Sequence, residues 1–406
     1  MKKSVVITVI FMIITGTVCA PDKLDAQDLK FDGYIESGLG VWSTNDENQD
    51  TLVKAFAVDS ERDGYRFRFN GIYQNEEKNA GARFRFQSQG RMDTAGYFSL
   101  PYAYGWVTFL NNIFNLAGGI IDDSAYTTAD WWFNDDSGEG LGLLLKINPV
   151  TGLSLGIGSY VISQQSSGSN NILQTGSGLP NFGNIRLKPD EVKYTFNAAY
   201  TLADAFRIGA GFRPKNNAGW NDGQETNTGR EETSQLTGEL RLLAVKDLTA
   251  VIIGILNKLD EFRDNGDITL SETFAYRINR EFTLGFNAVQ FFYNRPADKN
   301  PAFLFYLWGS YAFGKIVPRL DLAYFINGRS NTTTSSAVYH RRGFTPGDDL
   351  SVFSIRPSIK INLDSKTFLE IGDVINLDSS KNDIYHSNTK NSMCSNVFYI
   401  DMKWSF

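Results

Sequence analysis

The stretch Val397-Phe398-Tyr399-Ile400-Asp401-Met402-Lys403-Trp404-Ser405-Phe406 decides the fold, because apolar and polar residues alternate through it to the last position. The apolar set is Phe398, Ile400, Met402, Trp404 and Phe406. The intervening polar set is Tyr399, Asp401, Lys403 and Ser405. Successive side chains of a β-strand point to opposite faces, so this period of two predicts a strand with one apolar face and one polar face.

A final strand of this kind resembles the C-terminal strand of Gram-negative outer-membrane barrels. In such barrels the apolar face meets lipid and the polar face meets a water-filled lumen. The resemblance also implies that Trp404 and Phe406 form the signal that the barrel assembly machinery reads.

The beginning of the chain predicts a secretory signal peptide over residues 1–26. Lys2 and Lys3 give it a positive start, and the apolar core from Val5 to Val18 is too short for a transmembrane helix. We expect cleavage after Ala26, with cleavage after Ala20 as the alternative. The mature chain, residues 27–406, is then expected to form a single barrel.

Composition excludes a helical membrane protein, and the high aromatic content is consistent with a barrel. The chain has 406 residues, including 30 Phe, 18 Tyr and 7 Trp. Its mean hydropathy is −0.25, and no later stretch approaches the ~18 uninterrupted apolar residues of a spanning helix. The lipid-facing surface and the interfacial girdles of a barrel would accommodate so many aromatic side chains.

Charge and rare residues exclude several classes of function. The formal net charge is −6, which argues against a nucleic-acid-binding protein. Of the 2 Cys, only Cys394 remains after signal removal, so no intrachain disulfide can form. The chain has 2 His and no Cys/His cluster, so we expect no metal site, no cofactor and no enzymatic activity.

Alternating stretches recur along the chain in pairs, as hairpins do. Residues 191–201 and 206–213 are the clearest pair. Short connections, such as Asn148-Pro149, take turns with long polar ones, and that order is typical of barrels with short periplasmic turns and long outer loops. The pattern predicts an all-β transmembrane antiparallel barrel of about 18 strands, with 16 as the alternative. We place Thr51 to Asp59 in the first outer loop, because counting it as a strand gives an odd total.

Basic residues occupy the polar phase of several predicted strands. Arg66 and Arg68 alternate with aromatic residues in one strand of a hairpin, and Arg83 and Arg85 do so in the other. If the aromatic residues face lipid, these arginines form one basic patch in the lumen. The predicted pore-lining basic residues are Arg66, Arg68, Arg83, Arg85, Arg207 and Arg213.

The third long loop, around 122–138, carries acidic and aromatic residues. It resembles, in position and charge pattern, the loop of general porins that folds into the barrel and narrows it. The resemblance implies a constriction in which loop acids face wall arginines and set up a transverse field. The predicted constriction residues are Asp122, Asp123, Asp130, Trp131, Trp132, Asp135 and Asp136.

These patterns, together with the porin resemblance, favour a passive diffusion channel for small hydrophilic solutes and ions. We expect it in the outer membrane of a Gram-negative-type bacterium, with outer-membrane lipid as its surroundings. A homotrimer is the assembly that the analogy suggests. The alternatives are a structural surface barrel or adhesin with little conductance, and a sugar-selective channel in which Trp131 and Trp132 stack on sugar rings. The net charge does not decide the ion preference.

Overall fold

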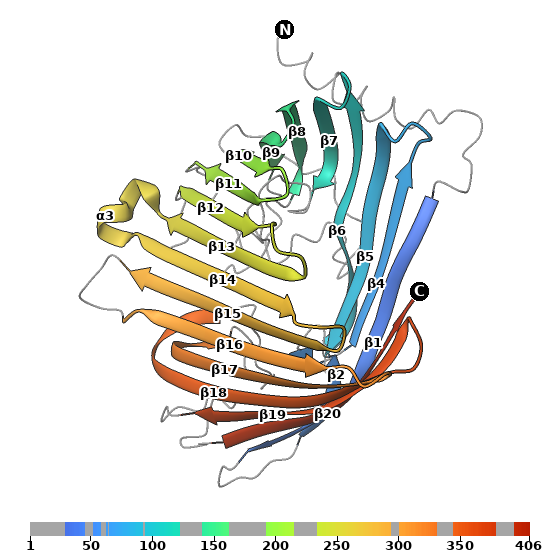
Figure 1. The fold of residues 1–406 in the computed structure, drawn as a ribbon, viewed down its shortest axis with the longest axis vertical. Helices are drawn as coiled ribbons and strands as arrows, with labels where there is room; N and C mark the ends of the chain where they lie inside the picture. The colour runs from blue at the N-terminus through green and yellow to red at the C-terminus, as the bar shows by residue number, and fades with distance from the viewer. Residues whose placement is uncertain are drawn as a thin grey trace.

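The computed structural model describes residues 29–44, 52–57, 62–63, 65–91, 94–121, 140–161, 192–214, 234–293, 300–330, 344–378 and 394–406. In this part of the chain, 18 antiparallel strands close into one barrel (Figure 1). The predicted all-β barrel of about 18 strands is confirmed, and the alternative of 16 is wrong. The barrel strands are β1 (Leu29–Thr44), β4 (Tyr65–Gln74), β5 (Ala80–Arg91), β6 (Thr94–Phe109), β7 (Phe114–Ile121), β8 (Gly140–Val150), β9 (Leu153–Val161), β10 (Val192–Leu202), β11 (Phe206–Arg213), β12 (Gln235–Leu242), β13 (Leu248–Asn257), β14 (Asp267–Arg277), β15 (Phe282–Tyr293), β16 (Ala302–Tyr311), β17 (Ile316–Ser330), β18 (Phe344–Asn362), β19 (Thr367–Asp378) and β20 (Cys394–Ser405).

Strand β1 closes the barrel, because it pairs with β20 along one side and with β4 along the other. Figure 1 shows the first strand, in blue, beside the last strand, in red. Every other strand of the ring pairs with its neighbours in the sequence. The ring therefore has no free edge, which is the condition for a sheet that crosses a hydrocarbon layer.

The segment that we placed in the first outer loop contains a strand. Strand β2 (Leu52–Ala57) pairs with Gly38–Trp42 of β1, directly beyond the point where Tyr65 of β4 pairs with Ser37. A two-residue strand, β3 (Arg62–Asp63), pairs in turn with β2. Strand β1 is longer than β4, and β2 pairs with the part of β1 that extends beyond the end of β4. Because β2 continues the place of β4 in the ring, the strand number does not change.

The two faces of the strands differ in polarity and in exposure. On β1, Phe31, Ile35 and Leu39 are 51%, 44% and 59% exposed, whereas Glu36 is fully buried. The same alternation continues on β20, where Ile400 is 43% exposed and its neighbours Tyr399 and Asp401 are fully buried. In a closed barrel, side chains on the convex outer surface are less crowded and more exposed than those on the concave inner surface. The exposed apolar residues therefore point outward, and the buried polar residues point inward.

The two rims of the barrel are built differently. One rim, called the turn rim here, carries short connections at residues 75–79, 110–113, 151–152, 203–205, 243–247, 278–281, 312–315 and 363–366. The opposite rim, the loop rim, joins β13 to β14 through a 3-10 turn (Leu259–Glu261) and the short helix α3 (Phe262–Asn265). Strands β7 and β9 both end at the loop rim.

One predicted turn lies slightly elsewhere. Strand β8 continues through Asn148-Pro149 to Val150, and the turn is formed by residues 151–152, where Gly152 has a φ of 86°. The pairing of β8 with β9 shifts register between Ile147 and Val150. Proline has no backbone N–H to donate, so an irregular part of the ladder is where a strand tolerates it.

Candidate functional site on the inner wall

Strands β4 and β5 place four arginines on one stretch of the inner wall. Arg66 and Arg68 pair across the sheet with Glu36 and Tyr34 of β1, so all four share the inner face. Arg83 and Arg85 of β5 pair with Tyr104 and Tyr102 of β6 in the same way. The intervening aromatic residues meet on the outside, where the rings of Phe31 and Phe69 stack at 5.2 Å and those of Phe69 and Phe84 lie 6.1 Å apart.

Neutral groups position several of these arginines. Arg85 Nε donates to Asn70 Oδ1 at 2.7 Å, and Arg68 Nη2 donates to Gln87 Oε1 at 3.4 Å. The guanidinium carbons of Arg83 and Arg85 lie 5.1 and 4.8 Å from the centre of the Tyr102 ring. An amide or an aromatic face orients a guanidinium without cancelling its charge. Asn70 also donates to Asp32 of β1, so one acid lies beside the four arginines and the region keeps an excess of positive charge.

Acidic residues enter the wall at the seam between β1 and β20. Glu36 pairs with Lys403, and Asp401 pairs with Glu370 of β19. Glu36 and Asp401 are both fully buried. The Lys403 Nζ lies 4.1 Å from the centre of the Tyr34 ring. Tyr34 pairs with Arg68, so the charged side chains of β20 and the arginines of β4 lie on either side of this ring.

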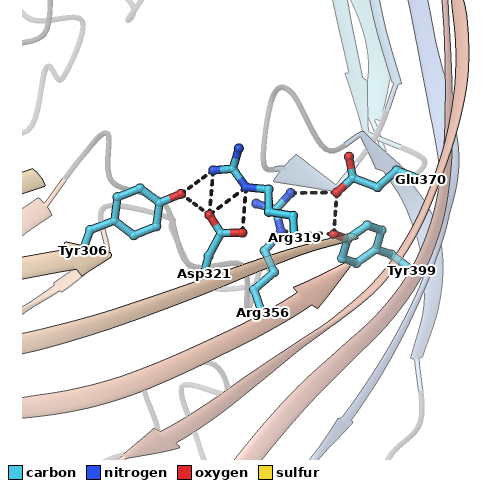
Figure 2. Close-up of polar contacts among 6 residues, drawn as sticks. All are labelled: Tyr306, Arg319, Asp321, Arg356, Glu370 and Tyr399. Carbon is cyan, nitrogen blue, oxygen red and sulfur yellow. Dashed lines mark hydrogen bonds and ion pairs between the residues drawn. The ribbon is translucent and has the colours of Figure 1, made fainter. Parts of the chain in front are cut away.

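A buried cluster of three side chains joins β18, β19 and β20 (Figure 2). Arg356 Nε donates to Tyr399 Oη at 3.0 Å, and Arg356 Nη2 lies 3.3 Å from Glu370 Oε1. The Tyr399 hydroxyl donates to the same Glu370 oxygen at 2.9 Å. The side chains of Arg356 and Glu370 are each 10% exposed, so this cluster fixes the wall and offers little surface to a solute.

A second cluster, beside the first in Figure 2, joins β16 and β17. Arg319 donates through Nε and Nη2 to the carboxylate of Asp321, at 2.7–3.0 Å, and through Nη2 to Tyr306 Oη at 2.8 Å. Tyr306 in turn donates to Asp321. The Arg319 guanidinium also lies over the Trp308 ring, 4.5 Å from its centre. Asp321 is buried, but the Arg319 side chain is 36% exposed, so its cation is the accessible part of the cluster.

Across the barrel from the β1–β20 seam, β11 and β12 carry a third charged group. Arg207 pairs with Arg241, and both lie near Glu239, at 3.8 and 3.5 Å. The arginine side chains are 26% and 35% exposed, whereas Glu239 is 2% exposed. Arg213, also half-buried, pairs with Gln235 nearer the loop rim. The group therefore presents two cations for one buried acid.

The predicted constriction acids and tryptophans lie outside the described residues. Their segment leaves β7 after Ile121 and returns at Gly140, both at the loop rim. The C-terminal residues of the predicted assembly signal are described. Trp404 is 46% exposed on the outer face, and the Phe406 ring lies 5.5 Å from it and 6.3 Å from Phe69.

Sequence reasoning did not single out Tyr306, Glu370 or Tyr399 as partners in the inner wall. Their strands carry the alternating pattern, which indicates the face of each residue. The pattern contains no signal for the partner, because Arg356 and Tyr399 are 43 residues apart and meet only through the register of three strands.

No group of three or more His, Cys, Asp or Glu side chains in the described residues could hold a metal ion. No helix in the part of the chain that the structure describes is long and apolar enough to cross a membrane.

Comparison with known proteins identifies the architecture. No protein-family model matches the chain, and no curated protein matches it. Among solved structures, a BenF-like porin from Pseudomonas fluorescens Pf-5 is similar at a TM-score of 0.54 and 9% identity, over 94% of this chain and 99% of that one. Pseudomonas aeruginosa OpdK, solved with vanillate, is similar at a TM-score of 0.53 and 10% identity, over 94% and 99%. The chain therefore has the fold of a porin-type outer-membrane barrel.

Proposed function

We propose that the chain is a passive diffusion channel for small hydrophilic solutes and ions in the outer membrane of a Gram-negative-type bacterium. The observation that supports this function best is the inner wall of the closed barrel. Arg207, Arg241 and Arg319 have side chains 26%, 35% and 36% exposed on that wall, while the outer face is apolar. A charged and partly exposed inner surface suits hydrated solutes, and an apolar outer surface suits lipid.

Conductance in a planar bilayer tests this function. The refolded protein, added at nanomolar concentration, is expected to produce stepwise increases of current of uniform size. A correctly folded barrel that inserts without producing steps would contradict the proposal and favour the structural surface barrel. The full burial of Glu36, Val397 and Tyr399 on the inner face is the observation in favour of that alternative, because it indicates a tightly packed lumen along β1 and β20.

We further propose that the channel favours anions. Basic residues outnumber acidic ones on the described inner wall away from the rims. The basic residues are Lys30, Arg66, Arg68, Arg83, Arg85, Lys146, Arg207, Arg213, Arg241, Arg319, Arg356, Lys360 and Lys403, and the acids are Asp32, Glu36, Glu239, Asp321, Glu370 and Asp401. An excess of one sign along a narrow channel raises the local concentration of the opposite ion.

The reversal potential in a KCl gradient measures this preference. The double variant Arg66→Ala/Arg68→Ala should shift the reversal potential toward cation preference, whereas Asp→Asn at Asp130, Asp135 and Asp136 should shift it toward anions. Both shifts should shrink above ~1 M salt, where the Debye length falls to ~3 Å. Unchanged reversal potentials at low salt in both variants would show that neither the arginines nor the loop acids line the path of the ions.

An aromatic ladder favours the sugar-selective alternative. Tyr102, Tyr104 and Trp106 follow one another on the inner face of β6, with ring centres 6.1 Å apart at each step. Arg83 and Arg85 lie beside them. Tyr102 is 1% exposed and lies against both guanidinium groups, which leaves Tyr104 and Trp106 to offer ring surface. Aromatic faces stack on pyranose rings, and guanidinium groups bind carboxylates, so a sugar acid would suit these two rings and the arginines. Block of the current by glucuronate, weakened in Trp106→Ala, would support this alternative; block that is absent or unaltered would remove it.

A further inference from the structure

Two polar residues lie on the outer face of the barrel, in the middle of its apolar surface. Glu272 of β14 pairs with Ile252 and Ala288 on the neighbouring strands, and Gln290 of β15 pairs with Leu270. These positions alternate with inner-face residues and share the outside with exposed aromatic and aliphatic side chains. Those side chains are Ile252, Ile268, Phe274, Leu284 and Phe292, each 37–40% exposed.

Glu272 is also at mid-height. It is the central residue of the 11-residue strand β14, which runs from the loop rim to the turn rim. At ~3.3 Å per residue and a tilt of about 45°, such a strand spans the ~25 Å apolar band of an outer-membrane barrel. The carboxyl group of Glu272 therefore lies near the middle of the lipid layer.

The two side chains are hydrogen-bonded to each other and can form further hydrogen bonds. Gln290 Nε2 lies 3.1 Å from both carboxylate oxygens of Glu272. A carboxylate can accept several hydrogen bonds, and a carboxamide has a second N–H and a carbonyl oxygen. Lipid chains satisfy none of these groups, whereas another protein surface can.

Beside the pair lies a strip of small residues, in register across four strands. Ala198 pairs with Ala210, Ala210 with Gly238, and Gly238 with Gly254, which pairs with Leu270 next to Gln290. A methyl group added at Gly238 or Gly254 would meet no atom within 4 Å. Small side chains at a membrane-facing surface allow another chain to approach closely.

We propose that the outer face of β10–β15 is a contact surface for a second copy of this chain within the membrane, with the Glu272–Gln290 pairs of the two copies hydrogen-bonded to each other. A second copy fits because the pair is self-complementary: each Gln290 can donate its second N–H to the carboxylate of the other copy. Such a contact is two-fold and isologous, whereas the homotrimer suggested by analogy needs a head-to-tail contact. The proposal rests on the membrane location in the proposed function.

Another outward acid provides a matched control. Asp373 of β19 pairs with Phe398 on the outer face and is hydrogen-bonded to Asn396. Its surroundings are large, since Phe398, Ile400 and Leu377 are each 43–45% exposed. Without a strip of small residues, another barrel cannot come close to this acid, so it should not contribute to the contact.

The number of copies in lipid nanodiscs or native outer-membrane particles, measured by mass photometry, tests the proposal. The wild type should be dimeric, and Glu272→Leu/Gln290→Leu should weaken association by about tenfold or more, because several hydrogen bonds in the membrane are lost together. Asp373→Leu should leave association unchanged. Removal of an outward charge should not impair folding, which heat-dependent gel mobility checks.

Cross-linking gives a second measurement. In a Cys394→Ser background, Ile252→Cys should form disulfide-linked dimers in oxidised membranes, because Ile252 pairs with Glu272 and is 38% exposed on the outer face. Ile400→Cys, which is 43% exposed but lies on β20, should not. An unchanged copy number in the Glu272/Gln290 variant, or cross-links at position 400 and none at 252, would overturn the contact. The conductance of each copy should be the same in all these variants. A protein that does not conduct would refute the proposed channel function, whereas the copy number would still test the contact between copies.

Discussion

Replacement of Arg356 should destabilise the barrel strongly, because it leaves a buried acid without its main partner. Arg356→Met removes the contact of 3.3 Å to Glu370 and the bond of 3.0 Å to Tyr399, while both ends of the ion pair are only 10% exposed. Removal of one member of a buried pair typically costs about 3–5 kcal/mol. Lys360 pairs directly with Glu370 across the sheet and retains part of the compensation, so we expect a loss of about 3 kcal/mol.

Urea unfolding in detergent micelles, followed by tryptophan fluorescence, measures this loss. The double variant Arg356→Met/Glu370→Met removes both charges and should recover at least ~1 kcal/mol of it, as expected for coupled neighbours. Arg277→Met is the control, since the Arg277–Asp247 pair lies at the turn rim with Arg277 56% exposed, and a surface pair contributes about 0–1 kcal/mol. A single variant no less stable than this control, or a double variant no better than the single, would refute the reasoning.

Three further predictions concern topology, assembly and pH. Single cysteines within 122–138 and within 164–190, in a Cys394→Ser background, should both react with an impermeant label on intact cells, and opposite accessibility would contradict the strand order. Phe406→Ala should lower the fraction of heat-modifiable, folded barrel in cells, because its ring packs against the outer face near the closing seam; an unchanged fraction would remove its role as an assembly signal. At the turn 363–366, the backbone N–H groups of Lys366 and Thr367 lower the pKa of Asp364. The stabilisation is therefore present above the ordinary carboxyl pKa and is lost as the pH falls through the lowered value, so Asp364→Ala should be less stable than the wild type at neutral pH and equally stable in strong acid.

The architecture could be predicted because the alternation of side chains is a local property. Tyr399 and Asp401 fall on the polar phase of a strand whose other phase is apolar, and only one way of closing such a sheet puts the apolar phase in lipid. The number of strands followed from the alternation of short and long connections. Neither inference requires knowledge of which strand lies beside which.

Pairing beyond the nearest hairpin could not be predicted. Strand β2 was assigned to the first outer loop because counting it as a strand gives an odd total, and it is a strand only because β1 extends past the end of β4. The partners of Arg356 and Arg319 also could not be predicted, because they depend on the register between strands. A shift of one strand by two residues would keep every face and change every partner, and nothing in the local sequence distinguishes these registers.

On the inner wall, acidic groups lie deeper than basic groups, because the side chains of acids are shorter. Asp321 and Glu239 are buried at the wall, with side chains 1% and 2% exposed, while Arg319, Arg207 and Arg241, bonded to them or near them, are 26–36% exposed. A carboxylate on a short stem lies close to the backbone, and a guanidinium on a longer stem reaches past it and still contacts it. A solute inside the barrel therefore meets the cation first, even where a cluster is nearly neutral. This arrangement supports the proposed anion preference independently of the count of charges, and it predicts that Asp321→Asn changes the reversal potential less than Arg319→Met does.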